Sequence, residues 1–174
     1  TALMPIVLLE QAGESDWRGV IQPSDWDAWW RSYDAFNEYF LGLAHRAEVD
    51  LYFIGSELNS TEKDLSRWQR VIASARERFD GKLAYSANWD RFDQVSFWRM
   101  VDFLAVSSYF ELEARDEPRP VAELTRVWEA TRDRLLAHAE RYDRPLIISE
   151  VGYPSLSTGA AFPWNYTATS GGTF

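Results

Sequence analysis

Short apolar runs alternate with longer amphipathic stretches along this chain. The runs are almost continuously apolar, as expected for strands that are buried on both faces of a sheet. They lie at residues 3–9, 51–55, 83–87, 103–107 and 146–149. Alternation of such runs with helical patterns predicts βα units and a parallel sheet.

The first two stretches between the runs predict long helices. Ser24 is expected to cap the first helix, which continues to about residue 47 and carries many aromatic side chains. In the second stretch, Thr61 followed three residues later by Asp64 resembles a capping box. Apolar residues at 65–79 then recur at spacings of three and four, as on one face of a helix.

The rest of the chain continues the pattern. A shorter helix is expected from Asp93, and a long one from about residue 120 to 141. Glycine and proline occur in the connections and do not divide the chain, so we expect one domain over residues 1–174.

Composition narrows the classes of function. The net charge of -9 disfavours nucleic acid or an anionic membrane as a partner, whereas a neutral polysaccharide is compatible with it. Nine tryptophans among 174 residues suggest that some rings lie on a binding surface. With no cysteine, disulfides and thiolate zinc sites are excluded. No signal peptide or membrane-spanning stretch is recognised, so secreted and cytoplasmic locations both stay open.

Two of the apolar runs end in a glutamate. In "FIGSELNS" Glu57 follows Ser56, and in "RPLIISEVGYP" Glu150 follows the last apolar run. In a (β/α) barrel the active site forms at the carboxyl ends of the strands. The other strand ends and the segments after them contribute an amide, rings and a further carboxylate: Asn88, Trp89, Tyr109, Tyr153 and Glu10.

A pair of carboxyl groups with aromatic rings is what glycoside hydrolysis requires. One carboxyl protonates the leaving oxygen, and the other attacks or stabilises the anomeric carbon. A single glutamate at a strand end can equally be a solvated residue or an ion-pair partner, but two in similar contexts favour a site. No cluster has metal-ligand spacing and no glycine-rich phosphate loop occurs, so we expect neither metal nor cofactor.

Four motifs, in this order, resemble glycoside hydrolase family 113: "FIGSELNS", "LAYSANWD", "VDFLAVSSYF" and "PLIISEVGYPS". That family comprises β-mannanase-type enzymes in the retaining clan A of (β/α)8 barrels. The resemblance implies an α/β fold in which the five runs correspond to strands 3 to 7 of a TIM barrel. We therefore expect a partial barrel, with open sheet edges through which the chain could self-associate.

The resemblance also implies roles for individual residues. Glu57 matches the acid/base and Glu150 the nucleophile, while Tyr109 matches a tyrosine that hydrogen-bonds the nucleophile. Burial and nearby negative charge are expected to raise the pKa of Glu57.

Substrate contacts follow from the same resemblance. Asn88 and Trp89 match sugar contacts, and Trp164 in "PWNY" matches an aromatic wall of the cleft. Ser56 stands where most of the clan has asparagine, and family 113 itself tends to carry a small hydroxyl residue there.

The expected activity is retaining hydrolysis of a β-linked polysaccharide, most specifically β-1,4-mannan. Two alternatives stay open. One is a carbohydrate-binding barrel remnant without turnover, and the other is a clan A glycosidase that acts on β-glucan or xylan.

Overall fold

The computed structural model describes residues 1–13, 16–112, 119–156 and 158–165. The strands are β1 (Ala2–Leu3), β2 (Leu51–Ser56), β3 (Lys82–Asn88), β4 (Phe103–Ser108) and β5 (Leu146–Val151). The helices are α1 (Trp26–Arg46), α2 (Leu65–Arg76) and α3 (Val121–Tyr142), with the 3-10 turns η1 (Arg18–Val20), η2 (Phe92–Gln94) and η3 (Trp98–Met100).

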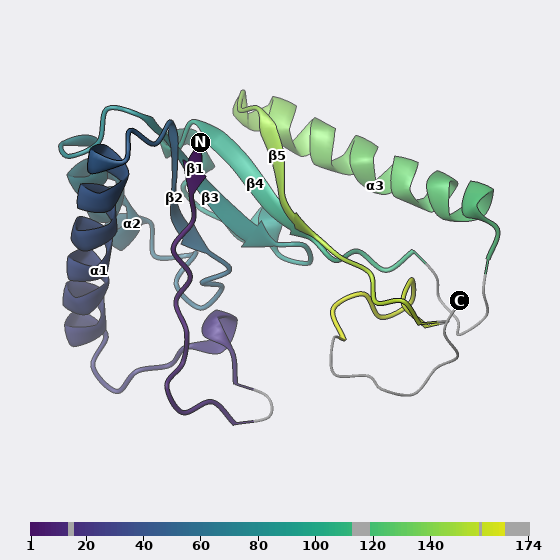
Figure 1. The fold of residues 1–174 in the computed structure, drawn as a ribbon, viewed down its shortest axis with the longest axis horizontal. Helices are drawn as coiled ribbons and strands as arrows, with labels where there is room; N and C mark the ends of the chain where they lie inside the picture. The colour runs from purple at the N-terminus through teal and green to yellow at the C-terminus, as the bar shows by residue number, and fades with distance from the viewer. Residues whose placement is uncertain (14–15, 113–118, 157, 166–174) are drawn as a thin grey trace.

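The strands form one parallel sheet in the order β1-β2-β3-β4-β5. Figure 1 shows α1 and α2 against one part of this sheet and α3 along β5. Each strand lies beside the strand that follows it in the sequence, which is the order of a (β/α)8 barrel. The chain therefore folds as part of such a barrel, as the sequence predicted.

Alternate side chains of the strands form two separate cores. The face toward the helices carries the larger one, in which Tyr85 and Trp68 are fully buried. The opposite face carries a small apolar layer of Phe53, Ala84 and Ala105. This opposite face corresponds to the interior of a barrel, and polar residues follow the apolar layer toward the carboxyl ends of the strands.

The three long helices are confirmed, but two of the predicted caps are wrong. Asp25, not Ser24, caps α1, because its carboxylate accepts the Ala28 N–H at 2.9 Å. Asp64, not Thr61, caps α2 through the Arg67 N–H. A cap must lie directly before the first helical turn, and that position is fixed by packing of the apolar face.

The first strand is much shorter than residues 3–9. Only Ala2 and Leu3 pair with β2, because Pro5 has no N–H to donate to a ladder. Val7 and Leu9 still pack against the larger core. Their apolar character therefore reflects burial without strand pairing.

The short helix predicted from Asp93 is replaced by the two 3-10 turns η2 and η3. Phe92, Val95, Phe97 and Trp98 are all buried, and their spacing does not fit one helical stripe. The Trp98 indole N–H donates to the Phe92 carbonyl at 2.7 Å, which closes this segment on itself.

In the described part of the chain, β1 and β5 occupy the two edges of the sheet. The side chains of β5 are partly buried or exposed, and Ile148 and Val151 are the exposed ones. None of the helices in the described ranges is both long and apolar enough to cross a membrane.

Candidate active site

The pairing of β2 and the pairing of β5 both contain a register shift close to a glutamate, Glu57 directly after β2 and Glu150 near the end of β5. In β2 the pairing with β3 shifts between Phe53 and Ser56. Gly55 lies within this shift, and its backbone passes close to the Trp68 and Tyr85 rings. Such a shift re-aims the residues after it.

A shift in the pairing of β4 with β5 changes the direction of Glu150. Val106 pairs with Ile148, but the next residue, Ser107, pairs with Glu150 and not with Ser149. By strict alternation from Ile147, which lies in the inner apolar layer, Glu150 would face the helices. The shift brings it level with Ser107 instead.

Both glutamates approach one arginine. Arg18 Nη2 lies 2.6 Å from Glu57 Oε2 and 4.0 Å from Glu150 Oε1. These two oxygens are therefore no more than 6.6 Å apart, the greatest separation that the two distances allow. Strand ends that are remote in sequence thus meet at a single point.

Glu57 is buried and held from both sides. One carboxylate oxygen accepts the Ser107 hydroxyl and the other accepts Arg18. Its backbone adopts a left-handed conformation with φ 52°, and its N–H donates to the Ser86 carbonyl at 2.7 Å. Desolvation raises the pKa of Glu57, and the charge of Glu150 acts in the same direction.

Glu150 is half-buried and hydrogen-bonded to a tyrosine. The Tyr109 hydroxyl donates to Glu150 Oε2 at 3.3 Å. Burial, followed by the nearby charge of Glu150, raises the pKa of Tyr109, so the hydroxyl keeps its proton as a donor. This is the contact that the sequence resemblance implied for these two residues.

Asn88 is the last residue of β3, and Trp89 follows it directly. The Asn88 side-chain oxygen accepts the Trp89 N–H at 2.9 Å. The Trp89 ring packs edge-on against Phe110, with centroids 5.7 Å apart. Trp89 also lines a hollow of about 490 Å³ that extends to Arg134 and His138 of α3.

Tyr153 and Trp164 lie in the segment after β5. The Tyr153 hydroxyl donates to the Phe110 carbonyl at 2.9 Å, and burial raises the pKa of Tyr153. Trp164 is exposed, and its indole N–H donates to Glu111 Oε1 at 3.3 Å. Both side chains therefore contact the segment that follows β4.

Ser56 and Glu10 occupy different environments. Ser56 is buried at the end of β2, and its hydroxyl has no hydrogen-bond partner among the described residues. Glu10 lies exposed in a turn well beyond the short β1. In the described part of the chain, it forms no hydrogen bond or ion pair with the other predicted site residues.

Sequence reasoning missed Arg18 and Ser107. Arg18 lies in η1, on a connection that gives no strand-end signal. Ser107 occupies a strand end like that of Asn88, so the same reasoning could have found it. Both contact Glu57 directly.

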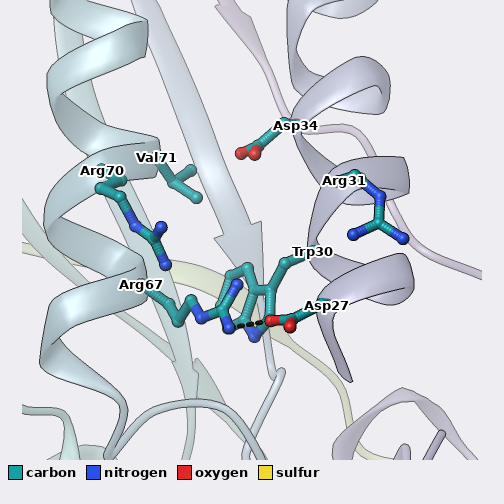
Figure 2. Close-up of a pocket in the computed structure, with 7 residues that line it drawn as sticks. All are labelled: Asp27, Trp30, Arg31, Asp34, Arg67, Arg70 and Val71. Atoms are coloured by element: carbon teal, nitrogen blue, oxygen red, sulfur yellow. Dashed lines mark hydrogen bonds and ion pairs between the residues drawn. The ribbon is translucent and has the colours of Figure 1, made fainter. Parts of the chain in front are cut away.

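A second hollow of about 450 Å³ lies between α1 and α2 (Figure 2). None of the predicted site residues lines it. Figure 2 shows the Asp34 carboxylate pointing toward α2, and an ion pair joins Asp27 to Arg67. The hollow contains side chains of both charges and no pair of carboxyl groups aimed at one point.

No group of three or more histidine, aspartate or glutamate side chains in the described ranges is placed to hold a metal ion.

Comparison with known proteins agrees with the partial barrel fold. A complex structure of a GH113 β-1,4-mannanase has a TM-score of 0.78 at 23% identity, covering 99% of this chain and 53% of that chain. The GH113 β-mannanase AaManA from Alicyclobacillus acidocaldarius, in complex with ManMIm, has a TM-score of 0.74 at 28% identity. That match covers 90% of this chain and 48% of the other. The chain thus spans about half the length of these structures.

No curated protein sequence matches this chain. The family model described as Glycoside Hydrolase Family 113 matches residues 4–172. Because this match extends over nearly the whole sequence, the chain belongs to glycoside hydrolase family 113.

Proposed function

We propose that this chain carries the catalytic pair of a retaining glycoside hydrolase that acts on a β-1,4-mannan. Glu57 is the general acid and base, and Glu150 is the nucleophile. In the first step the C–O bond to the leaving sugar breaks as Glu57 protonates its oxygen and Glu150 bonds to the anomeric carbon. Water, deprotonated by Glu57, then releases the sugar from Glu150 with net retention.

The observation that carries this proposal is the approach of both carboxylates to Arg18 Nη2. Their nearest oxygens are within 6.6 Å of each other, from distances of 2.6 and 4.0 Å to the same nitrogen. Retaining enzymes hold their carboxyl groups about 5–5.5 Å apart, and inverting ones roughly 6.5–9.5 Å. The limit of 6.6 Å includes the retaining separation and excludes all but the lower end of the inverting range.

The environments of the two glutamates support the division of roles. Burial raises the pKa of Glu57, which favours the protonated form that a general acid needs. Glu150 is more exposed and accepts a hydrogen bond from Tyr109, as a carboxylate nucleophile should.

The test uses an activated aryl β-mannobioside with the purified chain and two variants. Glu150→Ala is expected to be inactive until azide is added, and then to form the α-glycosyl azide, since azide attacks the face left open by the missing carboxylate. Glu57→Ala is expected to form the β-glycosyl azide, because azide there attacks the glycosyl-enzyme. Each variant should lose at least about 10²-fold in rate on unactivated mannan.

Glu129→Gln, an exposed glutamate on α3, serves as the matched control and should keep full activity. NMR detection of the opposite azide anomers, or near-full activity of both alanine variants on mannan, would contradict the assignment.

Binding without turnover is the second candidate, and one observation favours it. The ion pair between Arg18 and Glu57 opposes protonation of the carboxylate that must act as the acid. Calorimetric binding of mannooligosaccharides with no release of reducing ends would support this function. Oligosaccharides of β-glucan and xylan in the same assay test the alternative specificities.

A further inference from the structure

A second buried carboxyl group lies close behind Glu57 in the sequence. Glu62 is fully buried in the turn that connects β2 to α2. Its Oε1 accepts the Tyr85 hydroxyl at 2.8 Å. Tyr85 itself is fully buried on β3, among the rings of Trp68, Phe97 and Trp98.

The Tyr85 hydroxyl also accepts a hydrogen bond from the backbone. The Leu58 N–H donates to the Tyr85 oxygen at 3.0 Å. A hydroxyl has one proton, and here it points at Glu62, so its lone pairs are free to accept Leu58. The result is a directed chain from Leu58 through Tyr85 to Glu62.

This series of hydrogen bonds begins at Leu58, the residue directly after Glu57. Glu57 has φ 52°, a left-handed conformation that is unfavourable for a residue with a side chain. Such a conformation persists only when its surroundings hold it. The Glu57 N–H is tied to Ser86 and the Leu58 N–H to Tyr85, so the amide groups of both residues are anchored.

We propose that Glu62, acting through Tyr85, is a positioning residue that fixes the backbone of Glu57 and so aims its carboxylate at the reacting bond. The proposal rests on the function proposed above for Glu57. Glu62 does not touch the substrate, and its effect passes through the two hydrogen bonds that end at Leu58.

Burial of Glu62 is costly for a group with only a structural role. Its Oε2 has no hydrogen-bond partner among the described residues, and desolvation raises its pKa to about 7. The burial of Glu62 therefore lowers the stability of the folded chain, and Glu62 lies only five residues after the left-handed backbone at Glu57. Losses of this kind are typical of functional sites.

The test compares Tyr85→Phe, Glu62→Gln and Glu62→Leu in the intact chain. Hydrogen exchange of the Leu58 amide, measured by NMR relative to the amides of β4, should accelerate about tenfold or more in Tyr85→Phe and Glu62→Leu. Glu62→Gln should stay close to wild type, because its amide oxygen can still accept the Tyr85 hydroxyl.

Tyr52→Phe is the matched control. Tyr52 is as buried as Tyr85 and donates to Asn37 Oδ1 at 2.9 Å, so the variant loses a similar bond elsewhere. In Tyr52→Phe, the hydrogen-exchange rate of the Leu58 amide relative to the amides of β4 should not change. If Tyr85→Phe does not fold, the Glu62→Leu and Glu62→Gln pair decides the question.

Hydrolysis gives the second readout. In Tyr85→Phe, kcat should fall about 10- to 100-fold with KM nearly unchanged, since a misaimed acid slows chemistry more than binding. Unchanged relative exchange of Leu58 in the Tyr85 and Glu62→Leu variants, or equal acceleration in Tyr52→Phe, overturns the proposal. If the wild type hydrolyses nothing while Leu58 responds as expected, the anchoring of the turn stands and the proposed function fails.

Discussion

At the scale of single residues, Arg18 sets the charge around the candidate acid. Its guanidinium is 2.6 Å from Glu57 and lowers the carboxyl's pKa against the effect of burial. In Arg18→Met this effect is lost, so the pKa of Glu57 should rise further. The alkaline limb of the pH–rate profile on a mannooligosaccharide should then move to higher pH. An unmoved limb would mean that Arg18 does not act on the acid.

Two adjacent serines provide a sharper residue-scale test. Ser107 and Ser108 are both fully buried, but only Ser107 donates to Glu57, while the Ser108 hydroxyl has no partner among the described residues. Ser107→Ala should lower the free energy of unfolding by about 1–3 kcal/mol. Ser108→Ala should leave it unchanged or raise it, because the variant removes an unsatisfied buried hydroxyl. Urea denaturation measures both, and equal losses would contradict the assignment of the Ser107 bond.

At the scale of elements, the register shift of β2 depends on a glycine. A Cβ at Gly55 would lie 2.8 Å from the Tyr33 hydroxyl and 3.0 Å from the Trp68 and Tyr85 rings. Gly55→Ala is therefore expected to lower the free energy of unfolding by about 1–3 kcal/mol through overpacking.

Gly42→Ala is the matched control for this substitution. Gly42 lies within α1, and a Cβ there would meet only the flexible end of Arg46 at 3.4 Å. This variant should raise the free energy of unfolding by up to about 1 kcal/mol, since alanine is the better helix former. Urea denaturation of the two variants should give opposite signs. If both variants changed the free energy of unfolding in the same direction, close packing around Gly55 would not be the cause of the effect.

At the scale of the whole molecule, the buried Glu62 links stability to pH. Its pKa in the folded chain is about 7 against an ordinary value of 4.5. Between these values the folded state binds more protons than the unfolded state, so the free energy of unfolding falls as pH rises. The expected fall is about 3 kcal/mol. In Glu62→Gln this contribution should be absent, and parallel curves of stability against pH for the two proteins would contradict it.

Self-association through the sheet edges stays a prediction. Ile148 and Val151 are exposed on β5, which is an edge strand in the described part of the chain. Sedimentation velocity over a range of concentrations tests it, with a mass that stays monomeric as the contradicting result.

The class of fold and the two candidate glutamates could be predicted from the sequence. The alternation of apolar runs with helical stripes requires burial on both faces of a sheet, so parallel βα units followed from local pattern alone. The pattern gave the wrong prediction for two elements, the first strand and the short helix after β3. Pro5 ended β1 early, and the buried rings after β3 formed turns in place of a helix.

The assembly of the candidate site depends on tertiary contacts that the sequence pattern does not contain. The register shifts close to Glu57 and Glu150 arise from pairing between strands, which no single run encodes. Arg18 and Tyr85 reach the site from other elements, through contacts between residues that are distant in sequence. Sequence periodicity indicates which face of an element is buried. Whether side chains from different strands meet at one site depends on the curvature of the sheet and on the positions of its register shifts.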